Sequence, residues 1–114
     1  MKALVLQHKN RAAEVLEVPM PVEAPGEVIV RVEAAALNHR DVWIQKGQYA
    51  GLKYPIVPGS DGAGIVVAAS GAEDWVGKEV IINPALEWGD SANYQDPALF
   101  RILGCRMMGP LQSM

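Results

Sequence analysis

The sequence predicts a mainly β domain, either a barrel or a sandwich, with little helix. In the range 28–32 every second residue is a valine, and this period of two with β-branched residues is typical of a strand. Turn pairs such as Pro25-Gly26 and Asn83-Pro84 separate this and other short apolar runs. Only His39–Lys46, with Gly47 as its stop, predicts a helix. Several short strands between turns favour an all-β architecture.

The elements follow one another closely along the chain. We expect strands over residues 2–7, 13–18, 27–33, 65–69 and 79–82. Residues 49–58 are expected to form a loop because Pro55 and Pro58 exclude regular structure, and residues 70–74 are expected to form a turn. Beyond Ala85 the sequence predicts a long polar loop over residues 88–97 and no recognisable element.

Length and composition limit the classes of function. A chain of 114 residues has room for one domain, and half of its residues are apolar. The net charge is −3 and the basic residues are scattered singly, which argues against nucleic acid or an anionic membrane as partner. The single Cys105 excludes an internal disulfide and a multi-thiolate zinc site. With neither a signal peptide nor a membrane span visible, we expect a cytoplasmic protein.

The stretch from Pro58 to Gly64, PGSDGAG, places three glycines around Ser60 and Asp61. A phosphate-binding loop has a G-x-G-x-x-G pattern that follows a strand and opens a helix. Here the spacing is G-x-x-G-x-G, and an apolar run follows it that is expected to be a strand. The sequence therefore predicts no dinucleotide-binding site in this chain.

Several motifs in order resemble one known family. They are MKALVL, PGEVIVRVEAAALNHRDVWIQKGQY, YPIVPGSDGAGIVVAASG, VGKEVIINPALEWGD and FRILG, within Met1–Gly104. Together they resemble the N-terminal, GroES-like domain of the medium-chain dehydrogenase/reductase superfamily, which includes zinc alcohol dehydrogenases and zinc-free quinone reductases. The resemblance implies a GroES-like, partly open β-barrel with little helix over residues 1–104. It also implies that a separate Rossmann domain binds NAD(P)H in a full-length parent enzyme, with no cofactor bound by this chain.

The residues at the family's zinc positions depart from the zinc-binding pattern. By the resemblance, Asn38 stands where zinc members have a cysteine ligand, Ser60 where they have a histidine ligand, and Asp61 where they have a glutamate. A neutral carboxamide and a hydroxyl are poor zinc ligands. The structural zinc lobe of the family uses four cysteines, and residues 83–91 have none. We therefore expect no metal.

Two polar residues are candidates for substrate orientation, the catalytic role that the resemblance to zinc-free members implies. The Asn38 carboxamide can donate a hydrogen bond to a developing oxyanion without titrating, or it can serve only to form the turn after the strand. The Ser60 hydroxyl can donate likewise, although a local bond to the Pro58-Gly59 turn is favoured.

Further residues are expected near the substrate pocket. Asp41 and Asp61 are expected to form ion pairs with Arg40 or Lys46, or to hold backbone amides. Trp43 and Tyr49 are expected to form a pocket wall for a flat substrate, although packing against the barrel is favoured for Trp43. The glycines of the PGSDGAG stretch are expected to allow tight backbone turns.

Residues 105–114 differ from the continuation that the family leads us to expect. We interpret them as an aberrant or disordered tail left by a frameshift near Cys105. The chain is then a truncated substrate-side domain of a zinc-free, NAD(P)-dependent oxidoreductase, inactive alone, whose parent takes a small-molecule substrate. The alternative is a non-enzymatic GroES-like barrel that acts through self-association or protein interaction. A homodimer through exposed strand edges is expected in either case.

Overall fold

The structure, a computed structural model, describes residues 1–104 and confirms a mainly β fold. The predicted tail, residues 105–114, lies outside the described residues. Within residues 1–104 the elements are β1 (Lys2–Val5), β2 (Glu14–Glu17), β3 (Val28–Ala36), α1 (His39–Gln45), β4 (Asp61–Ala69), the 3-10 helix η1 (Glu73–Trp75), β5 (Glu79–Ile81), β6 (Ala85–Leu86) and β7 (Arg101–Ile102). No helix in this part of the chain is long and apolar enough to cross a bilayer.

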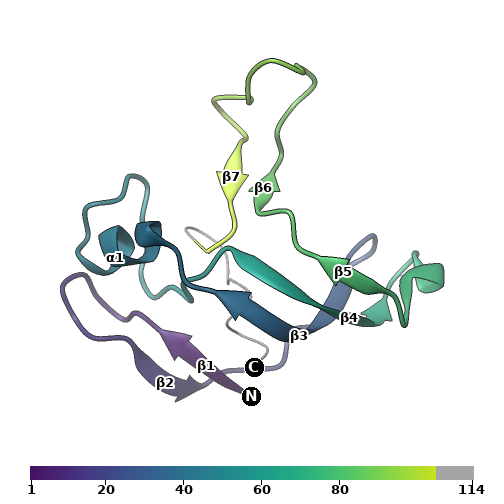
Figure 1. Ribbon diagram of the computed structural model, residues 1–114, viewed down its shortest axis with the longest axis horizontal. Coiled ribbons are helices and arrows are strands. Elements are labelled where there is room, and N and C mark those ends of the chain that lie inside the picture. The colour runs from purple at the N-terminus through teal and green to yellow at the C-terminus, as the bar shows by residue number, and fades with distance from the viewer. Residues whose placement is uncertain (105–114) are drawn as a thin grey trace.

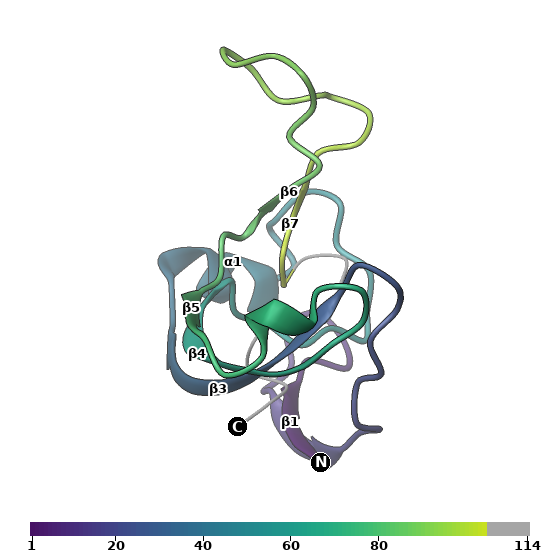
Figure 2. The same cartoon turned by 90° about the vertical axis from the view of Figure 1, so that its right-hand side faces the viewer.

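The strands form three small antiparallel sheets that together make an open, partial barrel (Figure 1). β1 pairs with β2, β4 lies between β3 and β5, and β6 pairs with β7. The loop that joins β6 to β7 extends away from the other sheets, and the perpendicular view in Figure 2 shows the same projection. The long β3–β4 pair is the largest contact between elements and forms the centre of the fold.

The buried core consists of two neighbouring clusters at the β1 end. One contains Leu6, Ile44 and Ile56, and the other contains Ala3, Val5 and Val57. Leu6 and Ile56 form an antiparallel bridge in which each backbone N–H donates to the other residue's carbonyl oxygen, at 2.8 and 3.0 Å. This bridge ties the loop after α1 to the end of β1, so the helix is held against the core through Ile44.

The predicted helix is confirmed, with Lys46 as its C-cap. The Gly47 N–H donates to the Ile44 carbonyl oxygen at 3.0 Å, and Gly47 has a φ of 68°. Glycine adopts this left-handed conformation without a steric penalty, which is why it commonly follows the last turn of a helix.

Strand boundaries differ from the sequence prediction in several regions, and β3 extends to Ala36 rather than ending at Glu33. β4 begins at Asp61 rather than Ile65, because the backbone of the glycine-rich segment pairs with Ala34, Ala35 and Ala36 of β3. β6 and β7 were not expected, since a strand of two residues carries no periodic pattern. Their pairing joins residues fifteen or more positions apart, which local sequence cannot indicate.

Gly64 allows the unusually close approach of β3 and β4. A Cβ atom added to Gly64 would lie 2.8 Å from the Arg31 carbonyl carbon and 2.9 Å from the Val32 Cα, and closer still to the Arg31 carbonyl oxygen. These are backbone atoms of the neighbouring strand, so no side-chain rotation relieves the overlap. The third glycine of the PGSDGAG stretch is therefore required by strand packing.

We expect Gly64→Ala to lower the free energy of unfolding by roughly 3 kcal/mol, because β3 must shift to admit the methyl group. The measurement is urea denaturation followed by circular dichroism. Ala34→Gly in the facing strand is the matched control and should cost only about 0.5–1 kcal/mol, the usual effect of a glycine inside a strand. A loss for Gly64→Ala no larger than that of the control would contradict the steric argument.

Tyr54 links the loop after α1 to the end of the helix. Its hydroxyl donates to the Ile44 carbonyl oxygen at 2.8 Å, and burial raises the pKa of the Tyr54 phenol. A raised folded-state pKa means that the neutral phenol is favoured in the fold. The contribution of the Tyr54 phenol to the free energy of unfolding is therefore fully present below the phenol's unfolded-state pKa of about 10. It is lost as pH rises through the phenol's folded-state pKa.

Tyr54→Phe should lower the free energy of unfolding by about 1 kcal/mol at neutral pH through loss of this hydrogen bond. Above about pH 10 the difference between the two proteins should narrow, since the phenol of the parent chain then ionises. Urea denaturation of both proteins at neutral and alkaline pH measures the difference, and all other titrating groups cancel in it. A difference in unfolding free energy that stays constant with pH would refute the stabilising role of the neutral Tyr54 phenol.

Candidate functional site

Asn38 and Asp61 meet where β3 leads into α1 and β4 begins. The Asn38 Nδ2 group donates a hydrogen bond to Asp61 Oδ2 at 2.5 Å, in a partly buried position. The β3–β4 ladder ends with Ala36 opposite Asp61, so Asn38 lies just beyond the last pair. The strand register therefore brings together two of the residues that the sequence analysis selected.

Asp41 connects the start of the helix to the loop before β4. One carboxylate oxygen, Oδ2, accepts from the Asn38 backbone N–H at 2.8 Å. The other, Oδ1, accepts from the Gly59 N–H at 3.2 Å. Of the two alternatives expected for Asp41, ion pair or holder of backbone amides, the structure has the second. A carboxylate in the first turn also complements the partial positive charge of the helix N-terminus.

Ser60 is the one polar residue in the buried set of the described chain, with 3% of its surface exposed. It lies between Gly59, which is held by Asp41, and Asp61, which is held by Asn38. The expected local bond between its hydroxyl and the Pro58-Gly59 turn is not among the hydrogen bonds of residues 1–104. Ser60 is therefore a buried residue next to Asp61 of the Asn38–Asp61 pair.

Trp43 lies on a different face of the helix. Its ring stacks on His39, with centroids 5.5 Å apart and an interplanar angle of 12°, and the Lys46 Nζ lies 5.3 Å from the ring centroid. At 3.6 residues per turn, Trp43 points about 160° around the helix axis from Asp41. The side chain is 41% exposed and belongs to neither core cluster, so it does not join the Asn38–Asp61 network.

Tyr49 is the aromatic residue that packs inward. It lies against the cluster of Leu6, Ile44 and Ile56 and is half-buried. The Arg40 guanidinium lies 5.1 Å from the centre of its ring, within cation–π distance. The packing that was expected of Trp43 is thus found at Tyr49.

Arg40 and Gly59 are site residues whose contacts the sequence analysis missed. The Arg40 Nη1 donates to the Leu103 carbonyl oxygen at 3.1 Å, which fixes the end of β7 near the helix. The Gly59 N–H anchors the loop through Asp41. Both contacts join residues far apart in the sequence, and no local signal indicates them.

The residues at this site fit neither a zinc ion nor a dinucleotide. Within residues 1–104, no group of three or more His, Cys, Asp or Glu side chains is placed to hold a metal. The donor set consists of a carboxamide, a hydroxyl and a carboxylate, and zinc sites in proteins use thiolate, imidazole and carboxylate ligands. Gly62 and Gly64 lie inside β4, whereas a pyrophosphate-binding loop opens a helix.

Comparison with known proteins shows one consistent family. The family described as "Alcohol dehydrogenase GroES-like domain" matches residues 24–113. A zinc-type alcohol dehydrogenase-like protein, YogA, from Leptosphaeria maculans is 36% identical over 93 residues, which are 76% of this chain and 26% of that protein. An acryloyl-coenzyme A reductase from Metallosphaera sedula is 42% identical over 67 residues, which are 59% of this chain and 20% of that protein.

A solved structure has the same fold. The crystal structure of an NAD-dependent alcohol dehydrogenase superposes with a TM-score of 0.80 at 39% identity and covers 96% of this chain. This chain corresponds to 35% of that protein, so it spans only about a third of the length of its relatives or less. The motifs, the strand order and these matches agree, and the chain belongs to the alcohol dehydrogenase GroES-like domain family.

Proposed function

We propose that this chain is the substrate-side domain of a zinc-free, NAD(P)-dependent medium-chain oxidoreductase of the alcohol dehydrogenase/quinone reductase type, inactive by itself. The observation that carries the proposal is the Asn38–Asp61 hydrogen bond, made by two residues at positions where the family resemblance places the zinc site. A carboxamide held in this way is suited to donate a hydrogen bond to a substrate oxygen. Asn38 is therefore the residue proposed to orient substrate, with Ser60 beside it.

The proposed substrate is a small molecule with a polarised double bond, such as an α,β-unsaturated carbonyl compound or a quinone. Reduction of such a bond places negative charge on an oxygen atom, and a preorganised N–H donor stabilises that charge. The relative named acryloyl-coenzyme A reductase has such a substrate in its name, which supports this class. NAD(P)H, held by another part of a longer enzyme, would supply the hydride.

The remaining pocket residues have different parts in the proposal. Asp41 and Asp61 hold the loop and the carboxamide in place rather than exchange protons. Tyr49, beneath Arg40, is proposed to form one wall of the pocket. Trp43, exposed on the other side of the helix, is proposed to contact substrate only at the pocket's outer rim.

The test is to titrate the purified 114-residue chain with NADPH by calorimetry and to measure its zinc content after dialysis against zinc. We expect no saturable NADPH binding and no stoichiometric zinc. A zinc-type alcohol dehydrogenase of full length is the positive control for both. Saturable binding of NADPH with a dissociation constant below about 1 mM, the upper end of usual KM values, or one zinc per chain, would overturn the proposal.

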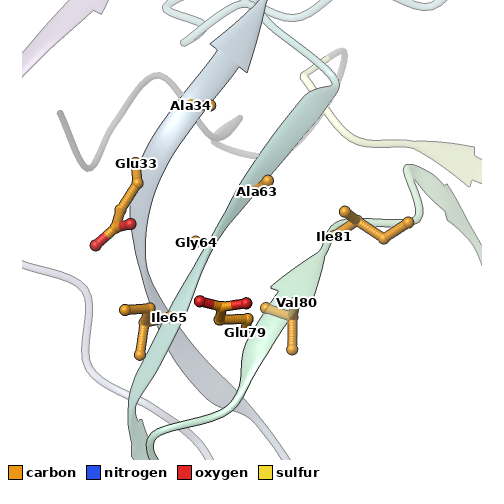
Figure 3. Close-up of a pocket in the computed structure, with 8 residues that line it drawn as sticks. All are labelled: Glu33, Ala34, Ala63, Gly64, Ile65, Glu79, Val80 and Ile81. Atoms are coloured by element: carbon orange, nitrogen blue, oxygen red, sulfur yellow. The ribbon is translucent and has the colours of Figure 1, made fainter.

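The alternative function, a non-enzymatic barrel acting through self-association, is favoured by one surface. β5 is an edge of its sheet among the described strands, and Ile81 on it is 87% exposed. Ile81 also lines a groove of about 460 Å³, together with Gly64 of β4, Glu33 of β3 and Glu79 of β5 (Figure 3). An exposed apolar strand edge is a template for pairing with a second chain.

We expect this chain to form a dimer by pairing of β5 edges, and Ile81→Lys to shift it to a monomer. A charge on an edge strand opposes edge-to-edge association. The measurement is size-exclusion chromatography with light scattering. Val22→Lys is the matched control, since Val22 is 84% exposed but lies outside every strand, and this variant should remain dimeric. A monomeric parent chain, or equal effects of the two variants, would exclude the β5 edge.

A further inference from the structure

The Asn38 carboxamide has its orientation fixed by its partner. An ionised carboxylate has only acceptor atoms, whereas a carboxamide has a donor end and an acceptor end. With 2.5 Å between Asn38 Nδ2 and Asp61 Oδ2, rotating the carboxamide by 180° would place two oxygen atoms against each other. Asp61 therefore selects the orientation in which the NH₂ group faces it.

The backbone of Asn38 is held by the Asp41 carboxylate. Its N–H donates to Asp41, whose second oxygen accepts from Gly59. Asn38 has extended backbone angles, φ −113° and ψ 157°, at the N-cap of α1. Both ends of the residue are thus anchored, one by each aspartate, and little freedom remains in the position of the carboxamide.

One hydrogen of the Asn38 NH₂ group is used by Asp61, and the Asn38 side chain accepts from the Asp41 backbone N–H in a capping box, which leaves the second hydrogen. A ligand that meets the second hydrogen must offer an oxygen acceptor. Because Asp61 accepts one hydrogen of the NH₂ group, the carboxamide cannot rotate freely, and its second N–H is a donor in a fixed position.

We propose that Asp61 is a positioning residue: it locks the Asn38 carboxamide so that its second N–H is presented to the carbonyl or enolate oxygen of the substrate. The identity of that oxygen rests on the proposed function. The locking itself does not, because it is a property of the chain without any ligand. Its test can therefore fail or succeed separately from NADPH and zinc binding.

The experiment is ¹H–¹⁵N NMR of the whole 114-residue chain, with the Asn38 side-chain NH₂ group as the reporter. We expect at least one Asn38 NH₂ hydrogen to exchange with solvent about tenfold more slowly than those of Asn10, an exposed residue in a turn. This comparison within one protein needs no variant. Equal exchange at Asn38 and Asn10 would overturn the proposal.

Asp61→Asn then tests the source of the locking, since it retains the size of the side chain but can face Asn38 with either end. We expect the exchange protection of the Asn38 NH₂ group to be lost and its two ¹H shifts to move together. Asp41→Asn is the matched control, because the Asp41 carboxylate, which this change alters, contacts the Asn38 backbone N–H and not the Asn38 carboxamide. That variant should shift the backbone N–H signals of Asn38 and Gly59 and leave the Asn38 NH₂ protection in place.

If Asp61 contributed only to general stability, Asp61→Asn would change the Asn38 NH₂ signals and the backbone amide signals throughout the chain together. Dispersed backbone signals in Asp61→Asn with an altered Asn38 NH₂ group support positioning. Unchanged Asn38 signals in that variant, or loss of the protection in Asp41→Asn with retention in Asp61→Asn, would refute it. If Asp61→Asn does not fold, the comparison of Asn38 with Asn10 in the parent chain decides the outcome.

Discussion

The antiparallel pairing of β3 with β4 is the constraint on which the other features of this domain depend. Each strand has nine residues, eight of which are paired, and the ladder ends with Ala36 opposite Asp61. The strands approach closely because Gly64 has no side chain. Two residues separate the end of the ladder from α1 on one strand, and the buried Ser60 directly precedes the ladder on the other. The pairing therefore positions both sides of the candidate site. The helix, the loop and the carboxamide take their positions from this one ladder.

The parts of the fold that could be predicted from the sequence are those with a local signal. The valine alternation of β3 and the glycine after α1 each have a physical cause within a few residues, and both predictions are confirmed. The first four residues of β4 were predicted to be a turn, since glycines disfavour strands in isolation. In the fold, the same glycines permit contact with the backbone of β3, and this contact outweighs the local preference.

The residues of the candidate site could be predicted from the sequence, but the contacts between them could not. Family resemblance selected Asn38, Ser60 and Asp61, but Asn38 and Asp61 are 23 residues apart and no spacing rule joins a carboxamide to a carboxylate over that distance. Trp43 and Tyr49 illustrate the same limit. Their separation of six residues does not say which ring faces the core, because the helix ends between them and Gly47 redirects the chain. The roles of these residues in substrate binding and the cytoplasmic location stay predictions.

The β3–β4 ladder contains two irregularities, one between Ile29 and Val30 and one between Val32 and Ala34. The first leaves an unpaired residue on β4 and the second leaves Glu33 unpaired on β3, so the second offset cancels the first. If the second irregularity were absent and Glu33 were paired, Ser60 instead of Asp61 would lie opposite Ala36. A hydroxyl, able to donate as well as accept, would then be the neighbour of Asn38, and the amide would no longer have one preferred rotamer. A backbone kink at a residue that never touches Asn38 thereby determines which chemical group the carboxamide meets.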